Sequence, residues 1–359
     1  MWQPNPQDAF PLPSRPNLEH YKKLAKALLK ARGDRDAIAK WAPDHIDELS
    51  EFAKRRLSVK CTLSEAQFVI ARAYGFLSWP KFAKYIASPV SNFEKAADAI
   101  ISGDEATLKR MLREDPKLIR ARSEREHRAT LLHYVSANGV ENYRQKSPKN
   151  AARIAEVLLN AGAEVDAEAD VYGSGWTTLG LVATSAPPDA AGVQIPLLDL
   201  LLNHGARTLS LSACIANGQP RAARFLADRG APFDLMSAAA LGRLDLLPKL
   251  KGTRAEKARA FVWACAYGQN DVAEYFLDHG VDIAAQDKDG QTGLHWAVIG
   301  AQMDTIEFLL ARNAPVEIRN VYGGTVLGQA WWSAEHGGDP KTYKRIIARL
   351  IERGARAES

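Results

Sequence analysis

The chain has 359 residues, of which 46% are apolar and 25% charged, as expected for a folded protein of two domains or of one domain plus a repeat array. Its three cysteines, Cys61, Cys214 and Cys265, are widely spaced and form no Cys-x-x-Cys pair, which argues against a disulfide framework and a zinc site. No apolar run approaches 18 residues and no signal peptide is recognisable, so we expect a cytoplasmic protein without a membrane span.

The formal net charge of +5 comes from the N-terminal part of the chain. Residues 1–90 carry 15 Lys and Arg against 9 Asp and Glu, whereas the remaining residues carry 32 against 33. This excess is modest, so charge alone does not indicate a nucleic-acid-binding protein. Residues 1–17 are rich in proline and are expected to form an N-terminal arm.

Four helices are predicted after the arm. Residues 18–33 place apolar side chains on one helix face and lysines on the others, which predicts an amphipathic helix ended by Gly33. Three more are expected over 44–57, from the Thr62 capping box to Gly75, and from Ser78. We expect residues 18–90 to form a basic helical capping segment, because the end of a repeat array must be covered.

Residues 70–82 resemble a helix-turn-helix, with alanine in the first helix and glycine in the turn. Reading DNA bases requires exposed polar side chains early in the second helix. Trp79 and Pro80 stand there, followed by Lys81 and Lys84, which favours packing or contact with a phosphate backbone. A DNA-associated regulator acting through these basic helices is therefore kept as an alternative, and nucleic acid as a less favoured partner.

The rest of the chain is repetitive, with a period of about 33 residues. The clearest unit begins at Thr292-Gly293-Leu294-His295-Trp296-Ala297 and ends at Val316. A shift of one period in either direction from Thr292, Leu294 and Ala297 gives Arg259, Phe261 and Ala264, or Thr325, Leu327 and Ala330. Each unit offers two short helices with apolar residues at helical spacing and a closing glycine, and must stack on its neighbours to bury them.

Thr-x-Leu-His-x-Ala at the start of this unit and Leu-Leu-x-x-Gly-Ala near the end of others resemble the ankyrin repeat. The first motif recurs at 130–133, and the second at 158–163, 201–206 and 226–231. About eight units fit between residues 92 and 357. The resemblance implies an all-α fold, an ankyrin-repeat solenoid of helix-turn-helix repeats with short β-hairpin fingers, preceded by the small helical domain. That domain resembles a segment of bacterial ankyrin-repeat proteins, a likeness that supplies no function.

Units 2 to 5 are irregular. Insertions follow Gly139 and occupy 184–192, and we expect them to pack together as one lobe. The connections 205–211 and 230–235 are too short for a finger, which predicts a notch in the row of fingers. The fingers on either side of the notch carry the tips Val171-Tyr172-Gly173 and Val321-Tyr322-Gly323, and Gly180 and Gly328 then replace the motif histidine.

The residue after the motif histidine points outward on the concave face of an ankyrin array. Aromatic residues hold this position in three units, and others are expected nearby or at finger tips, with Leu181, Ala213 and Ser237 as a small or aliphatic floor. The seven candidate partner-binding residues are Tyr134, Tyr172, Trp263, Tyr267, Trp296, Tyr322 and Trp332. Exposed aromatics on a concave face are typical interface anchors. The alternative is that irregular repeats or the N-terminal segment bury them.

No catalytic residues are predicted, because no dinucleotide, Walker, zinc-protease or serine-hydrolase motif occurs. The resemblance gives His133 and His295 a structural role in hydrogen bonding within and between repeats. An enzyme with Asp170, Tyr172, Asp189 and His133 converging at the inserted lobe is kept as a second alternative.

We therefore predict a monomeric, non-enzymatic binding module that needs no cofactor and no metal. Its expected partner is a protein or peptide segment held on the concave face, with a compact small-molecule ligand as a further possibility. No membrane association is expected.

Overall fold

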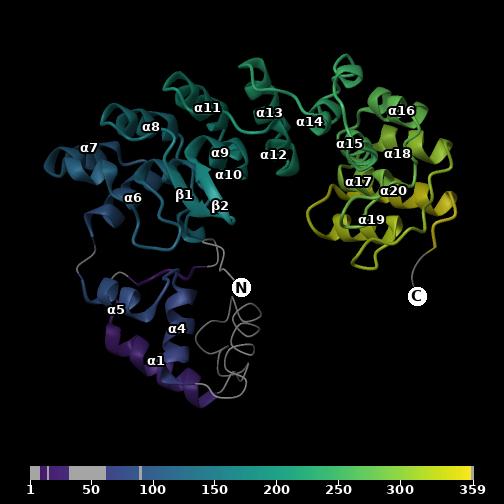
Figure 1. Ribbon diagram of the computed structural model, residues 1–359. Coiled ribbons are helices and arrows are strands. Elements are labelled where there is room, and N and C mark those ends of the chain that lie inside the picture. The colour runs from purple at the N-terminus through teal and green to yellow at the C-terminus, as the bar shows by residue number, and fades with distance from the viewer. Residues whose placement is uncertain (1–8, 14–15, 32–61, 89–90, 357–359) are drawn as a thin grey trace. The chain divides into compact units, whose positions relative to one another are not determined.

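The computed structural model describes residues 9–13, 16–31, 62–88 and 91–356, and it divides into two compact units, residues 1–209 and 210–359 (Figure 1). The described residues are mostly helical. The helix expected over 44–57 and Cys61 lie outside the described residues.

The N-terminal helices form a small aromatic core of their own. They are α1 (Leu18–Ala31), α4 (Leu63–Ala73) and α5 (Trp79–Ala87). The capping box starts α4 as predicted, because Thr62 Oγ1 accepts the Glu65 N–H at 3.3 Å and Glu65 Oε2 accepts the Thr62 N–H at 2.8 Å. Tyr21 and Phe82 pack edge to face with ring centroids 5.0 Å apart, so the apolar face of α1 is covered.

Short helices follow one another through the rest of the first unit. They are α6 (Asn92–Ser102), α7 (Glu105–Glu114), η3 (Pro116–Arg120), η4 (Leu131–Ser136), η5 (Asn142–Arg144), α8 (Ala151–Asn160), α9 (Thr178–Ala183), α10 (Ala186–Ala190) and α11 (Gln194–Asn203). The first helices of successive pairs, α6, η4 and α9, pack side by side in one row. The second helices, α7, α8 and α11, pack in another. Each pair thus shares its apolar faces with its neighbours.

One finger of the first unit forms a β-hairpin from β1 (Glu168–Val171) and β2 (Ser174–Thr177). Val171 pairs directly with Ser174, which leaves a two-residue loop. Both loop residues have positive φ, 53° at Tyr172 and 79° at Gly173, as a type I′ turn requires. A tyrosine in this conformation is strained, and the hydrogen bond from its hydroxyl to Asn138 Oδ1, 2.5 Å long, helps to hold it there.

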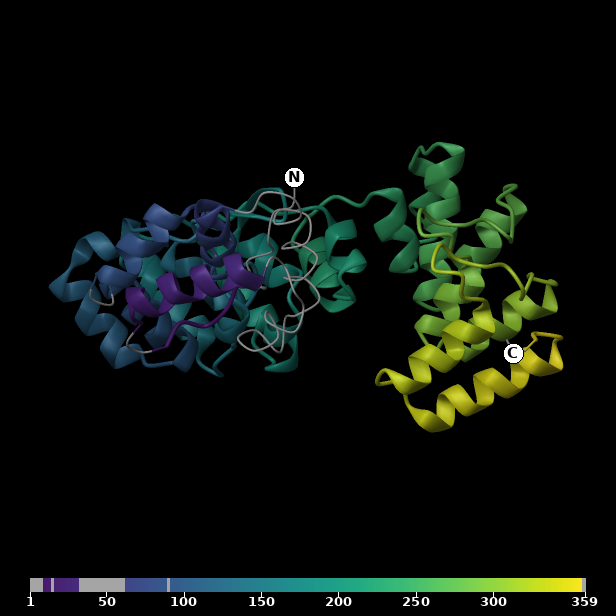
Figure 2. The same cartoon turned by 90° about the horizontal axis from the view of Figure 1, so that it is seen from below.

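The second unit repeats the arrangement. Its helices are α12 (Leu211–Ala216), α13 (Pro220–Asp228), α14 (Leu235–Ala240), η6 (Leu247–Lys249), α15 (Arg254–Ala266), α16 (Asn270–Asp278), α17 (Gly293–Ile299), α18 (Met303–Ala311), α19 (Val326–Glu335) and α20 (Pro340–Glu352). In one row α12, α14, α15, α17 and α19 follow one another, and α16 packs on α18. The last pair, α19 and α20, lies side by side at the yellow end (Figure 2).

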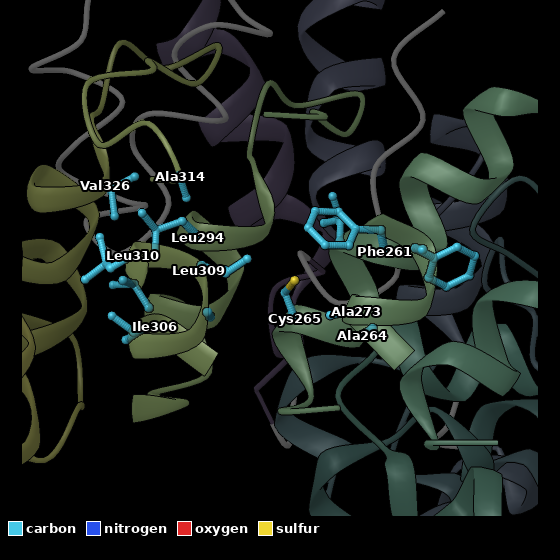
Figure 3. Close-up of a cluster of buried hydrophobic side chains, with 14 of the residues drawn as sticks. Phe261, Ala264, Cys265, Ala273, Leu294, Ile306, Leu309, Leu310, Ala314 and Val326 are labelled. Carbon is cyan, nitrogen blue, oxygen red and sulfur yellow. The ribbon is translucent and has the colours of Figure 1, made fainter. Parts of the chain in front are cut away.

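A continuous apolar core runs between these two rows. Leu294, Ile306 and Leu310 come from α17 and α18 and gather into one cluster, which Phe261 and Cys265 of α15 extend (Figure 3). No strand precedes α14 in the described connection 229–234, in line with the short connection in the sequence.

The two motif histidines form the same hydrogen bonds through Nδ1 but differ at Nε2. His133 Nδ1 accepts the Thr130 backbone N–H at 3.1 Å, and His295 Nδ1 accepts that of Thr292 at 3.2 Å. The ring proton of His133 therefore belongs on Nε2, which donates to the Trp176 carbonyl at 3.1 Å and so joins one pair to the next finger. Both side chains are fully buried. His133 makes the bonds within and between repeats that the resemblance implied, whereas His295 makes those within its repeat and its Nε2 has no partner among the described residues.

Burial lowers the pKa of His133 to about 4 and also lowers that of His295, because charging a desolvated ring is unfavourable. As the pH falls below the ordinary value of about 6.5, the unfolded chain takes up a proton that folded His133 refuses. We predict a loss of about 3 kcal/mol of folding stability from this histidine between pH 6.5 and 4. The free energy of unfolding, measured in urea across this range, should fall less steeply with decreasing pH in His133→Gln than in wild type. His279→Gln is the control, because His279 is exposed. Equal slopes for wild type and His133→Gln would contradict the prediction.

A buried arginine connects the N-terminal helices to the helical pairs. Arg125 is only 1% exposed, and its Nη1 donates to the carbonyl of Tyr74, at the end of α4, at 2.8 Å. Its guanidinium also lies over the Phe76 ring, 5.4 Å from the centroid. Glu126 adds a backbone hydrogen bond to the Gly75 carbonyl at 3.0 Å. These contacts pack the end of α4 against the start of the helical pairs.

Charged residues of the first insertion pair with this arginine and with α6. Glu141 is fully buried, and its Oε1 lies 2.5 Å from Arg125 Nε and 3.5 Å from Arg144 Nη1. The contact with Arg125 Nε is an ion pair whose alignment is too poor for a hydrogen bond. Arg144 also binds Glu94, and its Nε donates to Asp98 Oδ1 at 2.9 Å. Burial raises the pKa of Glu141, but Arg125, His127 and Arg144 together more than offset this and hold the pKa below its usual range.

The two insertions make different contacts. The first insertion, residues 140–148, folds back onto α6 through the Arg144–Glu94 ion pair. The second, residues 184–192, contains α10. Just after it, Gln194 Nε2 donates to the Val182 and Ser185 carbonyls at 3.1 Å. Thr184 and Ser185 of the second insertion also contact the residues just before the first, because Asn138 Nδ2 donates to Thr184 Oγ1 and Ser185 Oγ donates to the Ala137 carbonyl, each at 3.5 Å. The single lobe expected from the sequence stays a prediction.

Removing one charge from this buried network should be costly. In Glu141→Gln, the two arginines lose their shared counter-charge inside the protein, so we predict a loss of about 3 to 5 kcal/mol in the free energy of unfolding measured in urea. Glu114→Gln is the matched control, because Glu114 forms an exposed pair with Arg110 on α7, and its loss should cost no more than about 0.5 kcal/mol. Equal stabilities for Glu141→Gln and wild type would show that the network contributes nothing.

Candidate binding site

Three aromatic rings form a stack on the first helices of the second unit. Trp263 and Tyr267 lie on α15 and Trp296 on α17. The centroids of Trp263 and Tyr267 are 5.9 Å apart with 16° between the planes, and those of Trp263 and Trp296 are 5.5 Å apart with 28°. Because the two tryptophans hold the same position in successive repeats, adjacent helices bring them together. All three rings are half-buried.

An aspartate in the preceding finger fixes the orientation of Trp296. The indole Nε1 donates to Asp287 Oδ2 at 2.7 Å, while Asp287 Oδ1 accepts the backbone N–H groups of Asp289 and Gln291, each at 2.9 Å. The next finger repeats this turn, because Asn320 Oδ1 accepts two backbone N–H groups at 3.0 Å.

Beside these residues, a cavity of about 680 Å³ runs between the two fingers and helices α17 and α19. We call it the aromatic groove, and its lining residues are Asp289, Gln291, Trp296, Ile299, Asn320, Tyr322, Gly324, Gly328, Gln329 and Trp332. Tyr322 is 80% exposed and Trp332 57% exposed, which is unusual for large aromatic side chains. The Trp332 ring stacks on His336 with centroids 4.2 Å apart.

A missing histidine side chain helps to open the groove. A Cβ atom at Gly328 would meet only Thr325 Oγ1, at 3.6 Å, so the space is free. At the equivalent Gly180 of the first unit, the Trp176 ring would lie 3.1 Å from such a Cβ atom. The space left by the missing histidine side chain is therefore occupied by Trp176 in the first unit and stays open in the second.

The structure brings together three of the seven candidate residues, Trp296, Tyr322 and Trp332, in the aromatic groove. Trp263 and Tyr267 stack behind Trp296 without lining the groove. Tyr172, 44% exposed, belongs to the first unit, so the notch expected between it and Tyr322 stays a prediction.

The expectation for Tyr134 was wrong. Its side chain is completely buried, because the insertion folds over it and Arg144 lies above its ring, 5.8 Å from the centroid. Leu181 and Ser237, expected on the concave floor, are also buried.

The sequence analysis did not predict the polar residues that line the groove, although a repeated pattern in the sequence indicates them. Asn320 follows Asp287 by one repeat period and makes the same turn. A search for polar residues repeated at this spacing would have found both fingers.

The geometry does not support nucleophilic catalysis, either by the residues near the two insertions or by the described cysteines. His133 uses both ring nitrogens in buried hydrogen bonds, and the Tyr172 hydroxyl is bonded to Asn138. Burial raises the pKa of the Cys214 thiol to about 12 and that of Cys265 further, so neither is a ready nucleophile. Within the described ranges, no cluster of three or more acidic, histidine or cysteine side chains is arranged to hold a metal.

Two further observations concern the alternatives. Trp79 packs on Phe82 with centroids 5.6 Å apart, so the start of α5 is used for packing, while Lys81 and Lys84 are exposed. Among the described helices, none has the length and apolar character to cross a bilayer.

The stack and one wall of the groove lie in a segment that matches a sequence-family model. Residues 261–310 match the family model of ankyrin repeats (many copies). The match covers all of α16 and α17, the C-terminal part of α15 and all of α18 except its last residue, and thus includes Trp263, Tyr267 and Trp296. Ankyrin repeats generally mediate protein–protein interactions. No curated protein matches the chain.

The hydrogen bond from Trp296 to Asp287 can be tested without disturbing the finger. In Asp287→Asn the turn should persist, because Asn320 makes the same turn in the next finger, but the neutral amide is a weaker acceptor for the indole N–H than the carboxylate. We predict a loss of about 1.5 to 3 kcal/mol in stability and an upfield shift of the Trp296 indole proton in NMR. Asp289→Asn serves as control for the lost charge. An unchanged indole resonance would contradict the assignment.

Proposed function

We propose that this chain is a non-enzymatic binding module, and that its aromatic groove holds a short segment of a partner protein. The observation that carries the proposal is the convergence of Trp296, Tyr322 and Trp332 on one cavity. This cavity adjoins repeats of a family that generally binds proteins.

The exposure of two of these rings favours an interface. Aromatic side chains bury about 150 to 250 Å² each when covered, and at about 25 cal/mol per Å² this is worth several kcal/mol per ring. Tyr322 and Trp332 leave much of that surface in water. Residues of this type, placed beside a cavity, are the usual anchors of protein interfaces.

The shape of the groove favours a narrow segment over a flat surface. Gly324 and Gly328 contribute no side chains to its lining, so a partner backbone can approach closely. The volume also lies in the range of small-molecule pockets, about 300 to 1,000 Å³, which keeps a compact ligand as the alternative occupant.

The wider proposal is a cytoplasmic, monomeric solenoid of about eight ankyrin repeats in 92–357, capped by residues 18–90. The successive helical pairs of each unit and the buried contact of Arg125 with Tyr74 support it. The match over 261–310 supports ankyrin repeats in that part.

Selection from a random peptide display library against the full chain tests the binding role. We predict peptides whose affinity falls about thirtyfold in Trp332→Ala, the equivalent of about 2 kcal/mol for an interface anchor, with an unchanged thermal melt. Tyr322→Ala should act in the same direction. The matched control is Ile351→Ala on α20, because Ile351 is 50% exposed and lies outside the groove. Peptides that bind both groove variants as tightly as wild type would contradict the proposal.

A further inference from the structure

The charge of the groove lining suggests what kind of side chain enters it. Asp289 is the charged residue of the lining, which contains neither lysine nor arginine. Lys288 lies 3.8 Å from the Asp289 carboxylate, but its side chain is 85% exposed, so the pair is weak. Arg319 uses Nη1 to bind the Gly323 carbonyl at 2.6 Å on the finger. A lining of aromatic rings, amides and a carboxylate favours a cation.

The hydrogen bond of Trp296 favours contact of its ring with a cation. Its N–H donates to the Asp287 carboxylate at 2.7 Å, and this negative charge polarises the indole and makes its π face more electron-rich. Trp263 covers one face of the ring, yet Trp296 still lines the groove. Cations bind best over electron-rich faces of tryptophan.

An unused acceptor lies in the same lining. Gln291 is 9% exposed, and its carboxamide oxygen has no hydrogen-bond donor among the described residues. A buried acceptor without a partner is costly. Because this oxygen is closed to solvent, the Gln291 side chain has to turn toward the groove before it can accept an N–H group from a ligand.

We propose that the aromatic groove takes an arginine side chain from the partner segment. The planar guanidinium would stack on the rings of Trp296 or Trp332 and donate to the Asp289 carboxylate and the Gln291 carboxamide. Arginine fits better than lysine, because it is flat, is more weakly hydrated and carries five N–H donors. This inference rests on the proposed function, since it names the residue that the groove recognises.

The test uses the peptides acetyl-Gly-Ser-Arg-Ser-Gly-amide and its citrulline and lysine counterparts on the ¹⁵N-labelled full chain. Citrulline keeps the shape of arginine without the charge. We expect the arginine peptide to shift the Trp296 indole N–H signal, assigned through Trp296→Phe, and to bind about tenfold or more tightly than the citrulline peptide, with lysine between them. Equal affinities for arginine and citrulline, or no shift of this signal, would overturn the inference.

Two matched variants separate the charge from the rings. Asp289→Asn should weaken the arginine peptide about tenfold and leave the citrulline peptide unchanged. Lys288→Met, which removes the competing cation next to Asp289, should bind arginine at least as tightly as wild type. An Asp289→Asn protein with undiminished preference for arginine would count against the proposed contact.

Failure of this inference is distinguishable from failure of the proposed function. If library peptides depend on Trp332 but bind equally well after their arginines are replaced by citrulline, the groove is a binding site and the arginine assignment is wrong. If no selected peptide depends on Trp332 or Tyr322, the proposed function itself fails.

Discussion

The short first helices of the second unit cannot bury their apolar residues alone, and the rest of the structure depends on this constraint. Helix α17 has only seven residues, fewer than an isolated helix needs to be stable in water. It must therefore pack between α15 and α19, which also complete its core. Because stacking sets equivalent positions of neighbouring repeats beside each other, Trp263 meets Trp296, and the groove opens next to α19.

Polar turns then fix the fingers against the stacked helices. Asp287 and Asn320 each close a turn with their side-chain oxygens, and Asp287 extends this bonding to the Trp296 indole. The groove thus depends on the same residues that build the fingers. Gly328 stands where the repeat motif has a structural histidine, and its lack of a side chain leaves room beside Trp296. In the first unit, Trp176 fills the corresponding space at Gly180.

Local patterns in the sequence predicted what depends on one repeat or on its neighbour: the helical pairs and the hydrogen bonds of the motif histidines within their own repeats. They named Trp296, Tyr322 and Trp332 as candidates but did not predict that these three would share one cavity. They failed where distant residues decide burial. Tyr134 was expected at the surface, but Arg144 of the insertion reaches back to Glu94 on α6, an earlier part of the chain, and closes over it. The repeat period contains no information on such an ion pair, because the insertion is not part of the repeat.

The central claim is that the aromatic groove is where a partner segment binds. Hydrogen–deuterium exchange of the full chain, with and without a saturating library-selected peptide, tests it most directly, since every backbone amide reports. We predict slower exchange concentrated in residues 287–299 and 320–332, which form the two fingers and the helices that line the groove. Protection confined to the first unit, with these two segments unchanged, would contradict it.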